Sequence, residues 1–135
     1  MAQKIIPDIF KNARDGMTAA CAKATGPARE GDVMFNDFQI EGEWFTVMDS
    51  AVKRDFTFSE AVSLSILCID QEENDYYWSK ISRNPANEQC GWCKDQFGVS
   101  WQIVPANMEE LTRRPGAFRT LMNQKKIVIE EYDRE

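Results

Sequence analysis

The chain has 135 residues, of which 43% are hydrophobic, 28% charged and 11% aromatic, and its formal net charge is −6. This length fits one domain with a packed core, and the acidic balance disfavours a nucleic-acid partner, because phosphate backbones are also negative. The sequence contains neither the run of about 20 apolar residues that a membrane helix needs nor a signal-peptide pattern, so we expect a cytoplasmic protein with no membrane partner.

The first part of the chain predicts a β-hairpin. Residues 17–24 fit a strand or a helix equally well, and residues 25–32 are rich in turn-forming types. Apolar residues then alternate over 33–40, and a second apolar segment, 44–48, follows a connection that contains glycine. Two such segments joined by a short glycine turn are typical of a hairpin.

The second part predicts a strand-helix-strand-strand unit. Apolar and small polar residues alternate over 61–69, which predicts a strand. Asp70 and Glu73 have the spacing of a helix N-cap and its reciprocal partner, which predicts a helix over 71–82.

Two short strands and two helices are predicted in the remainder. The strands span 89–95 and 98–104 around a glycine-containing turn. The helices span 105–111 and 117–123 and are separated by a Pro-Gly break, whereas 125–132 is ambiguous.

Two of the four cysteines, Cys90 and Cys93, have the C-x-x-C spacing of dithiol oxidoreductases. That chemistry places the first thiol at a helix N-terminus, but these residues belong to a predicted strand, where positions three apart point to opposite faces. We therefore interpret them as strand residues, with a redox role as the alternative. The chain contains no His, so we expect no zinc site.

Several segments, in their order and spacing, resemble one family. They are FSEAVSL at 58–64, CIDQE at 68–72, YW at 77–78 and CGWCKDQFGVSWQIVP at 90–105. Together they resemble the PhnB-like family, also described as 3-demethylubiquinone-9 3-methyltransferase domains, within the glyoxalase/bleomycin-resistance/dioxygenase (vicinal oxygen chelate) superfamily. The resemblance covers about residues 31–130.

The resemblance implies an α+β fold in which paired βαβββ modules form an incomplete barrel around a pocket, usually within a homodimer. On that basis residues 1–135 form a single domain. It comprises a shortened N-terminal module (about 1–50), a C-terminal βαβββ module (about 56–105) and a helical tail (106–135).

The N-terminal module is shorter than the family pattern. Residues 2–13 resemble either remnants of the family's first strand and helix or the helix alone. In both cases a sheet edge would lack its neighbour. We hypothesise that a strand or helix exchanged across the homodimer covers that edge.

Enzymes of the superfamily hold a divalent metal with His, Gln and Glu side chains, and the resemblance places Ser63 and Gln102 at two such positions. Neutral Ser and Gln side chains are poor ligands for borderline metals, so we expect no metal and no other cofactor. A Gly-rich turn of the kind that usually binds S-adenosylmethionine is also not visible.

Six residues are candidates for lining a pocket: Glu60, Ser63, Ser65, Trp92, Trp101 and Gln102. The glutamine is either a hydrogen-bonding group in the pocket or a core amide, and the serines either line the pocket or fill space. The glutamate is a general base if buried and otherwise a solvated loop acid. The tryptophans are core or pocket-wall residues. Lys94 and Asp95 are expected to form a surface pair beside a turn.

These observations favour a metal-independent protein that binds an unidentified small molecule. The alternative is an enzyme that acts on a small organic substrate, by 3-demethylubiquinone 3-methyl transfer or by metal-assisted glyoxalase or dioxygenase chemistry. The sequence assigns no catalytic residue to either reaction.

Overall fold

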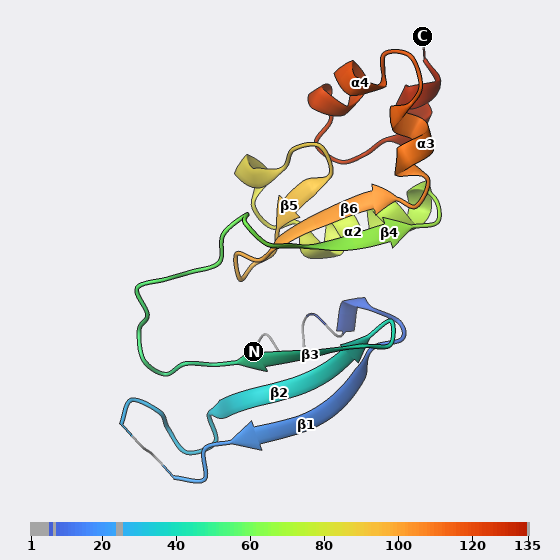
Figure 1. Cartoon of the computed structure of the whole chain (residues 1–135). Coiled ribbons are helices and arrows are strands. Elements are labelled where there is room, and N and C mark those ends of the chain that lie inside the picture. Colours follow the sequence, from blue (N-terminus) through green and yellow to red (C-terminus); the bar gives the residue numbers. More distant parts are fainter. Residues whose placement is uncertain (1–5, 7, 24–25, 135) are drawn as a thin grey trace. The chain divides into compact units, whose positions relative to one another are not determined.

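The computed structural model describes residues 6, 8–23 and 26–134. The chain divides into two units, Met1–Phe56 and Thr57–Glu135. Each unit contains a three-stranded sheet, and the helices lie mainly in the second, so the predicted α+β class is confirmed (Figure 1). Within the described ranges, no helix combines the length and the hydrophobicity needed to cross a bilayer.

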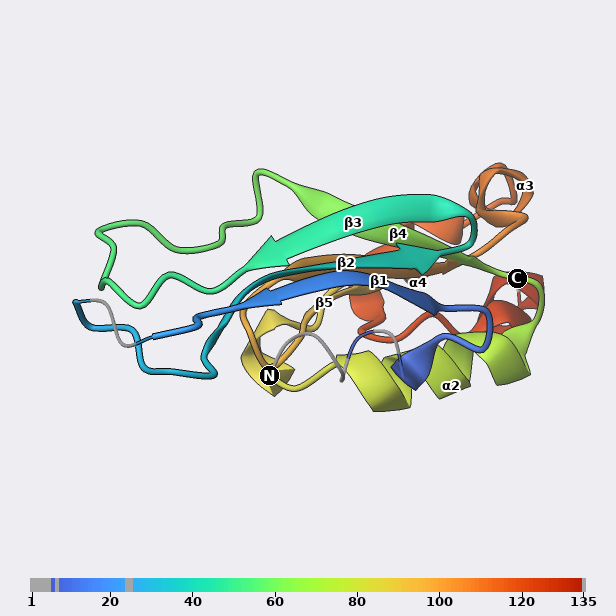
Figure 2. The same ribbon diagram turned by 90° about the horizontal axis from the view of Figure 1, so that it is seen from below.

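The sheet of the first unit is antiparallel throughout. Its strands are β1 (Arg14–Ala20), β2 (Val33–Ile40) and β3 (Glu43–Met48), with β2 in the centre (Figure 2). The predicted hairpin is confirmed: Glu41 and Gly42 connect β2 to β3 and have φ angles of 51° and 81°. Two consecutive positive φ values are the geometry of the two-residue turn that best matches strand twist.

Burial in this unit follows the alternation of β2. Asn36, Phe38 and Ile40 are buried, whereas the residues between them are partly exposed. Phe38 also stacks on Phe45 of the neighbouring strand, with ring centroids 5.7 Å apart. The alternation of apolar residues along β2 therefore indicates which side of this sheet is shielded from water.

Two ambiguous segments have different outcomes. Residues 17–20 belong to β1, so the strand alternative holds there, and residues 24 and 25 lie outside the described part. Of residues 2–13, for which two alternatives are open, five (2–5 and 7) also lie outside it, and residues 6, 8 and 9 are helical.

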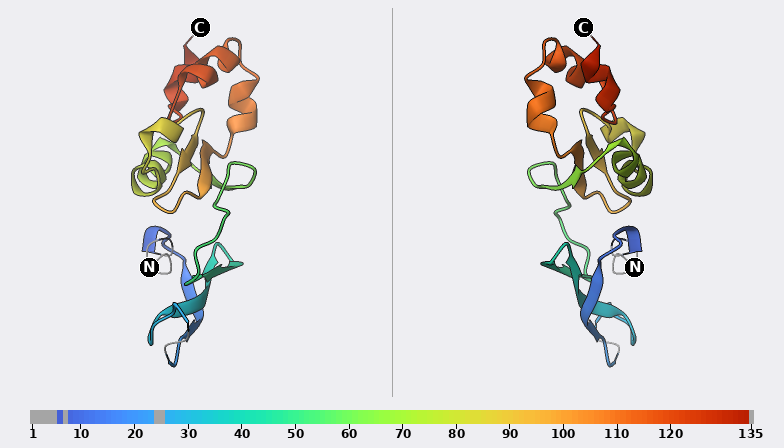
Figure 3. Two further views of the ribbon diagram at one scale, coloured as in Figure 1. Left: turned by 90° about the vertical axis from the view of Figure 1, so that its left-hand side faces the viewer. Right: turned by 90° about the vertical axis from the view of Figure 1, so that its right-hand side faces the viewer.

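The second unit has the predicted strand-helix-strand-strand order. It runs through β4 (Ser63–Cys68), α2 (Gln71–Ile81), a 3-10 turn η1 (Pro85–Asn87), β5 (Trp92–Lys94) and β6 (Ser100–Pro105). The last strand lies in the centre of the sheet, parallel to β4 and antiparallel to β5. The helix packs along one side of this sheet (Figure 3).

The N-terminus of α2 is fixed by the residues that the sequence indicates. The Asp70 carboxylate accepts a hydrogen bond from the backbone N–H of Glu73 at 2.8 Å. The Glu73 carboxylate in turn accepts from the N–H of Ile69 at 3.4 Å, one residue before the cap. This near-reciprocal arrangement satisfies donors that the first helical turn leaves free.

The chain ends in a small helical layer. It contains α3 (Met108–Thr112), α4 (Ala117–Asn123) and a 3-10 helix η2 (Ile129–Asp133). These elements pack around an apolar cluster whose members are Leu111, Ala117, Ile127 and Tyr132. The ambiguous segment 125–132 thus enters the core without forming a strand or an α-helix.

Candidate functional site

The β4–β6–β5 sheet has two chemically different faces, because successive side chains of a strand point to opposite sides. One face, called here the covered face, is shielded from water and carries Cys68, Cys93, Trp101 and Ile103, each no more than 4% exposed. The other face, called here the polar face, carries Ser63, Ser65, Trp92, Lys94, Ser100 and Gln102, and it ends in the apolar pair Leu67 and Val104. Four of the six predicted pocket residues therefore share one face of one sheet.

A hydrogen bond joins two of these residues. The Gln102 side-chain amide donates from Nε2 to the Ser63 hydroxyl at 2.9 Å. Both residues are half-buried, and Ser65 lies beside Gln102 in the register of the parallel strands. A neutral amide and two hydroxyls can donate to and accept from an uncharged polar ligand.

The fifth predicted residue, Glu60, reaches this face through an ion pair. Its carboxylate lies 2.6 Å from the ammonium of Lys94, whose side chain is only 20% exposed, whereas that of Glu60 is 60% exposed. The hydrogen bond from Lys94 holds the pKa of Glu60 below its usual value. Glu60 is therefore a carboxylate at neutral pH and faces water, as a loop acid does.

A cavity of about 330 Å³ opens beside these groups. Glu60, Lys94, Trp92 and Ser100 line it, together with Cys93 and with residues 86–89, which span the end of η1 and its connection to β5. Ser100 is almost completely buried, and its hydroxyl has no hydrogen-bond partner within the described residues. Buried hydroxyls are normally hydrogen-bonded, so the Ser100 hydroxyl is available to form a hydrogen bond with a ligand in this cavity.

A family model described as 3-demethylubiquinone-9 3-methyltransferase matches residues 1–104. The chain belongs to this family. Among solved structures it is similar to a PhnB protein from Bacillus cereus, with 29% sequence identity and a TM-score of 0.64. The similarity covers 77% of this chain and 87% of that chain. No curated protein matches.

The polar face of this PhnB-like chain does not offer a set of metal ligands. Ser63 and Gln102 are bonded to each other, and the carboxylate of Glu60 is paired with Lys94. Across the part of the chain that the structure describes, no three His, Cys, Asp or Glu side chains form a group that could hold a metal ion. These residues do not fit the metal that the superfamily resemblance implies.

The connection that follows β4 does not resemble a binding site for a methyl donor either. Only Ile69 and Asp70 separate β4 from α2, so this turn contains no glycine. The nucleotide-binding folds that hold S-adenosylmethionine approach it with a Gly-rich turn at this place. The family description alone therefore does not identify residues for methyl transfer.

The sixth predicted residue, Trp101, lies on the covered face and away from the other five. Its indole Nε1 donates to the carboxylate of Asp95 at 2.9 Å, and both residues are buried. The same carboxylate accepts from the backbone N–H groups of Phe97 and Val99 at 2.8 and 3.0 Å. Of the two interpretations of this tryptophan, the core residue is correct.

The prediction of a surface pair at Lys94 and Asp95 is wrong. Consecutive strand residues point to opposite faces, so Lys94 reaches the polar face, whereas Asp95 turns inward and closes the β5–β6 turn. Asp95 is 6% exposed, and its negative charge is matched by three donors instead of by the neighbouring ammonium.

The C-x-x-C pair is split between two environments. Cys93 is buried in β5, and burial raises the pKa of its thiol to about 12. Cys90 precedes the strand in a left-handed conformation with φ of 52°, so it is not a strand residue as predicted. Both thiols are free. A raised pKa disfavours the thiolate that dithiol exchange requires.

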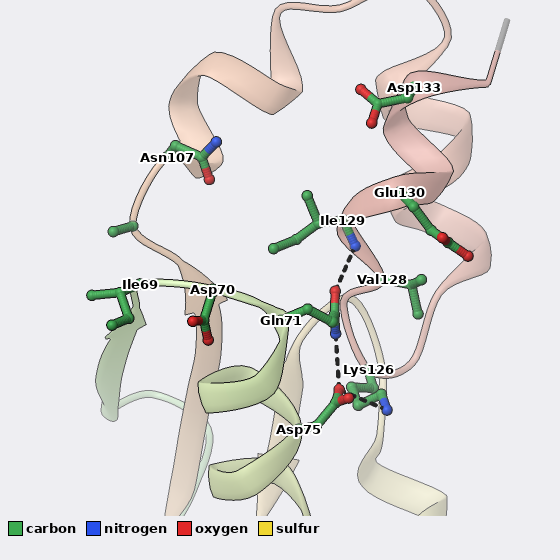
Figure 4. Close-up of a pocket in the computed structure, with 11 residues that line it drawn as sticks. Ile69, Asp70, Gln71, Asp75, Asn107, Lys126, Val128, Ile129, Glu130 and Asp133 are labelled. Atoms are coloured by element: carbon green, nitrogen blue, oxygen red, sulfur yellow. Dashed lines mark hydrogen bonds and ion pairs between the residues drawn. The ribbon is translucent and has the colours of Figure 1, made fainter.

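A larger cavity, of about 880 Å³, lies where β4 and β6 end and α2 begins (Figure 4). Gln71 spans its wall: its amide donates to Asp75 and to the carbonyl of Ile127, and its oxygen accepts from the N–H of Ile129. Lys126 forms an ion pair with Asp75 at 2.8 Å. These polar groups are bonded to one another and fasten the C-terminal segment to α2.

Two residues of the polar face, Lys94 and Ser100, are not among the six residues that the sequence predicts to line a pocket. A signal for both was present in the strand alternation, since Ser100 and Gln102 are two residues apart, as are Trp92 and Lys94. The register that brings the two strands together was not visible in the sequence.

Proposed function

We propose that this PhnB-like chain binds a small organic molecule at the polar face and needs no metal to do so. The observation that carries the proposal is the composition of this face: it presents hydroxyls, an amide, an ammonium and a tryptophan, and three of these residues, Trp92, Lys94 and Ser100, line a cavity of about 330 Å³. Small-molecule sites combine an aromatic surface with a few polar groups that fix orientation. Metal independence is supported by the residue types at the positions that resemble the superfamily's ligands, because the neutral side chains of Ser63 and Gln102 are poor ligands for borderline metals.

The proposal includes a homodimer as the working form. Its support is the resemblance of the sequence to a family that usually forms homodimers, together with large apolar side chains that remain exposed within single units. Met17, Trp44 and Met48 of the first unit are 62–78% exposed. Side chains of this size are often covered by a partner.

An enzyme on a small organic substrate is the second candidate, because the family description names a methyltransferase. A turnover that Gln102→Ala abolishes while the fold stays intact would favour this candidate. Methyl transfer would also require binding of S-adenosylmethionine, which isothermal titration measures directly.

The test combines metal analysis with a binding screen. Natively purified protein, before and after incubation with nickel, zinc and manganese, should contain far less than one metal ion per chain. Small phenols, quinones, aromatic amides and aromatic carboxylates are then screened by protein NMR. Members of this set should shift the backbone amide signals of the polar face.

A matched pair of variants locates the binding. Ala86→Tyr places a bulky ring at the cavity, whereas Ser79→Tyr places the same ring at an exposed position of α2. We expect binding to be lost in the first variant and retained in the second. One metal ion per chain would refute metal independence, and equal binding by both variants would refute the site.

A further inference from the structure

Among the described residues that line the cavity, Lys94 is the one cation, and it is largely removed from water. Its side chain is 20% exposed, and its ammonium lies 2.6 Å from a single carboxylate oxygen, that of Glu60. Lysines are rarely this buried unless they are paired, because a desolvated ammonium without an anion is costly. An anion must therefore remain at Lys94 whenever the site is closed to water.

The anion at this position comes from a segment that is easily displaced. Residues 49–62 are exposed throughout and form neither helix nor strand after β3 ends at Met48. The Glu60 side chain is 60% exposed, so its carboxylate can return to water at little cost. The two partners are thus unequal: Lys94 requires an anion, but that anion need not be Glu60.

The residues around Lys94 determine which kind of anion could replace the Glu60 carboxylate. Trp92 lies two residues before it on the same face of β5, and Ser100 lies opposite it on β6. All three line the cavity of about 330 Å³, and the Ser100 hydroxyl has no partner within the described residues. A ligand carboxylate can accept from the ammonium with one oxygen and from the hydroxyl with the other, while an attached ring packs against the indole.

The same cavity limits the ligand to a single negative charge. Glu88 also lines it, and its carboxylate accepts a hydrogen bond from the Ser82 hydroxyl at 2.9 Å. No second cation lines the cavity among the described residues to balance another anion. Like charges in one cavity repel, so dianions such as phosphate esters are disfavoured.

We propose that Glu60 occupies, in the free chain, the place of a ligand carboxylate at Lys94, and that the polar face binds small aromatic monocarboxylates that displace it. This inference rests on the proposed function and names the ligand class for the same site. Glu60 then competes with the ligand for the Lys94 ammonium, and ligand binding releases the Glu60 carboxylate into solvent.

The test compares benzoate with its neutral isostere benzamide, in the full chain, by NMR titration of backbone amide signals. Benzoate should bind more tightly than benzamide and should shift the signals of Trp92, Lys94 and Ser100. Glu60→Gln removes the competing charge and should tighten benzoate binding about fivefold, the order of magnitude that an exposed ion pair contributes. Glu109→Gln removes a carboxylate from an exposed ion pair on α3 and should change nothing.

Removal of the ammonium is the complementary change. Lys94→Met should abolish the preference for benzoate over benzamide, whereas Lys94→Arg keeps a cation and should retain it. The arginine variant keeps the inference testable if the methionine variant does not fold.

Each outcome separates this inference from the proposed function. Equal binding of benzoate and benzamide, or no gain in Glu60→Gln, overturns the carboxylate exchange and leaves a site for neutral molecules. Binding of benzoate that Lys94→Met does not weaken also overturns it. If neither benzoate, benzamide nor any other compound of the screen shifts the polar-face signals, the proposed function fails as well.

Discussion

The two faces of the β4–β6–β5 sheet use polar groups in opposite ways. On the covered face, Asp95 is buried and accepts hydrogen bonds from three donors, including the indole of Trp101. On the polar face, Lys94 is paired with a carboxylate that is mostly in water, and the Ser100 hydroxyl has no partner within the described residues. Completed networks hold a fold together, whereas groups with weak or missing partners are available to a ligand.

The largest difference between the faces should appear when apolar side chains are shortened. Ile103 is fully buried on the covered face, so Ile103→Ala leaves a cavity and should lower the free energy of unfolding by about 4 kcal/mol. Leu67 belongs to the opposite face and is 63% exposed. Leu67→Ala should lower the free energy of unfolding by less than about 1 kcal/mol. Urea denaturation followed by circular dichroism measures both.

An equal loss in the two variants would contradict the comparison. It would mean that the face of Leu67 is packed as tightly in solution as the face of Ile103.

The second prediction concerns the hydrogen-bond network around Asp95 on the covered face. Asp95→Ala leaves the Trp101 indole and the N–H groups of Phe97 and Val99 without their acceptor, so the free energy of unfolding should fall by about 3 kcal/mol. The control is Gln96→Ala in the same turn, where the side chain is exposed, and its effect should stay within about 0.5 kcal/mol. A loss below about 1 kcal/mol in Asp95→Ala would show that water replaces the carboxylate.

The third prediction concerns the thiols of the covered face and alkaline pH. Burial raises the pKa of Cys68 and of Cys93 from 9.0 to about 12. The folded chain then holds these protons more tightly than the unfolded chain. Stability is therefore fully present below pH 9 and should fall as the pH rises from 9 towards 12, as thermal unfolding across this range would show. Tyr132, whose pKa burial raises to about 12, should add to the loss near the upper end.

Thiol labelling in the native state tests the same burial directly. Cys21 and Cys90 are half-exposed and should react with a disulfide reagent at pH 8, whereas Cys68 and Cys93 should react only after denaturant is added. Labelling of Cys93 as fast as Cys90 would refute its burial. A disulfide between these two residues in oxidised protein would revive the redox interpretation.

The sequence predicted the elements of the second unit well, because their signals are local. The Asp70 cap and the alternation of β4 depend on residues within one turn or one strand, and both are confirmed. The face of the sheet to which a side chain points was predicted where alternation along one strand is enough to decide it, as for Ser63 and Ser65.

Pairings between distant segments could not be predicted in the same way. The ion pair of Lys94 with Glu60 and the bond of Gln102 to Ser63 join segments more than thirty residues apart. Neither follows from propensity or periodicity, because both depend on β6 lying between β4 and β5. The inward turn of Asp95 was missed for a related reason: its donors appear only once the β5–β6 turn is formed.

The smallest effect is expected where the polar face has its own hydrogen bond. Gln102→Ala removes the amide that donates to Ser63, but both residues are half-buried, so water can take its place. The free energy of unfolding should therefore fall by less than about 1 kcal/mol, while binding of any ligand of this face should weaken measurably. A loss above about 2 kcal/mol would give this bond the structural role of the Asp95 network. The two faces would then differ in exposure alone, and the case for a binding site would rest on Lys94, Trp92 and Ser100.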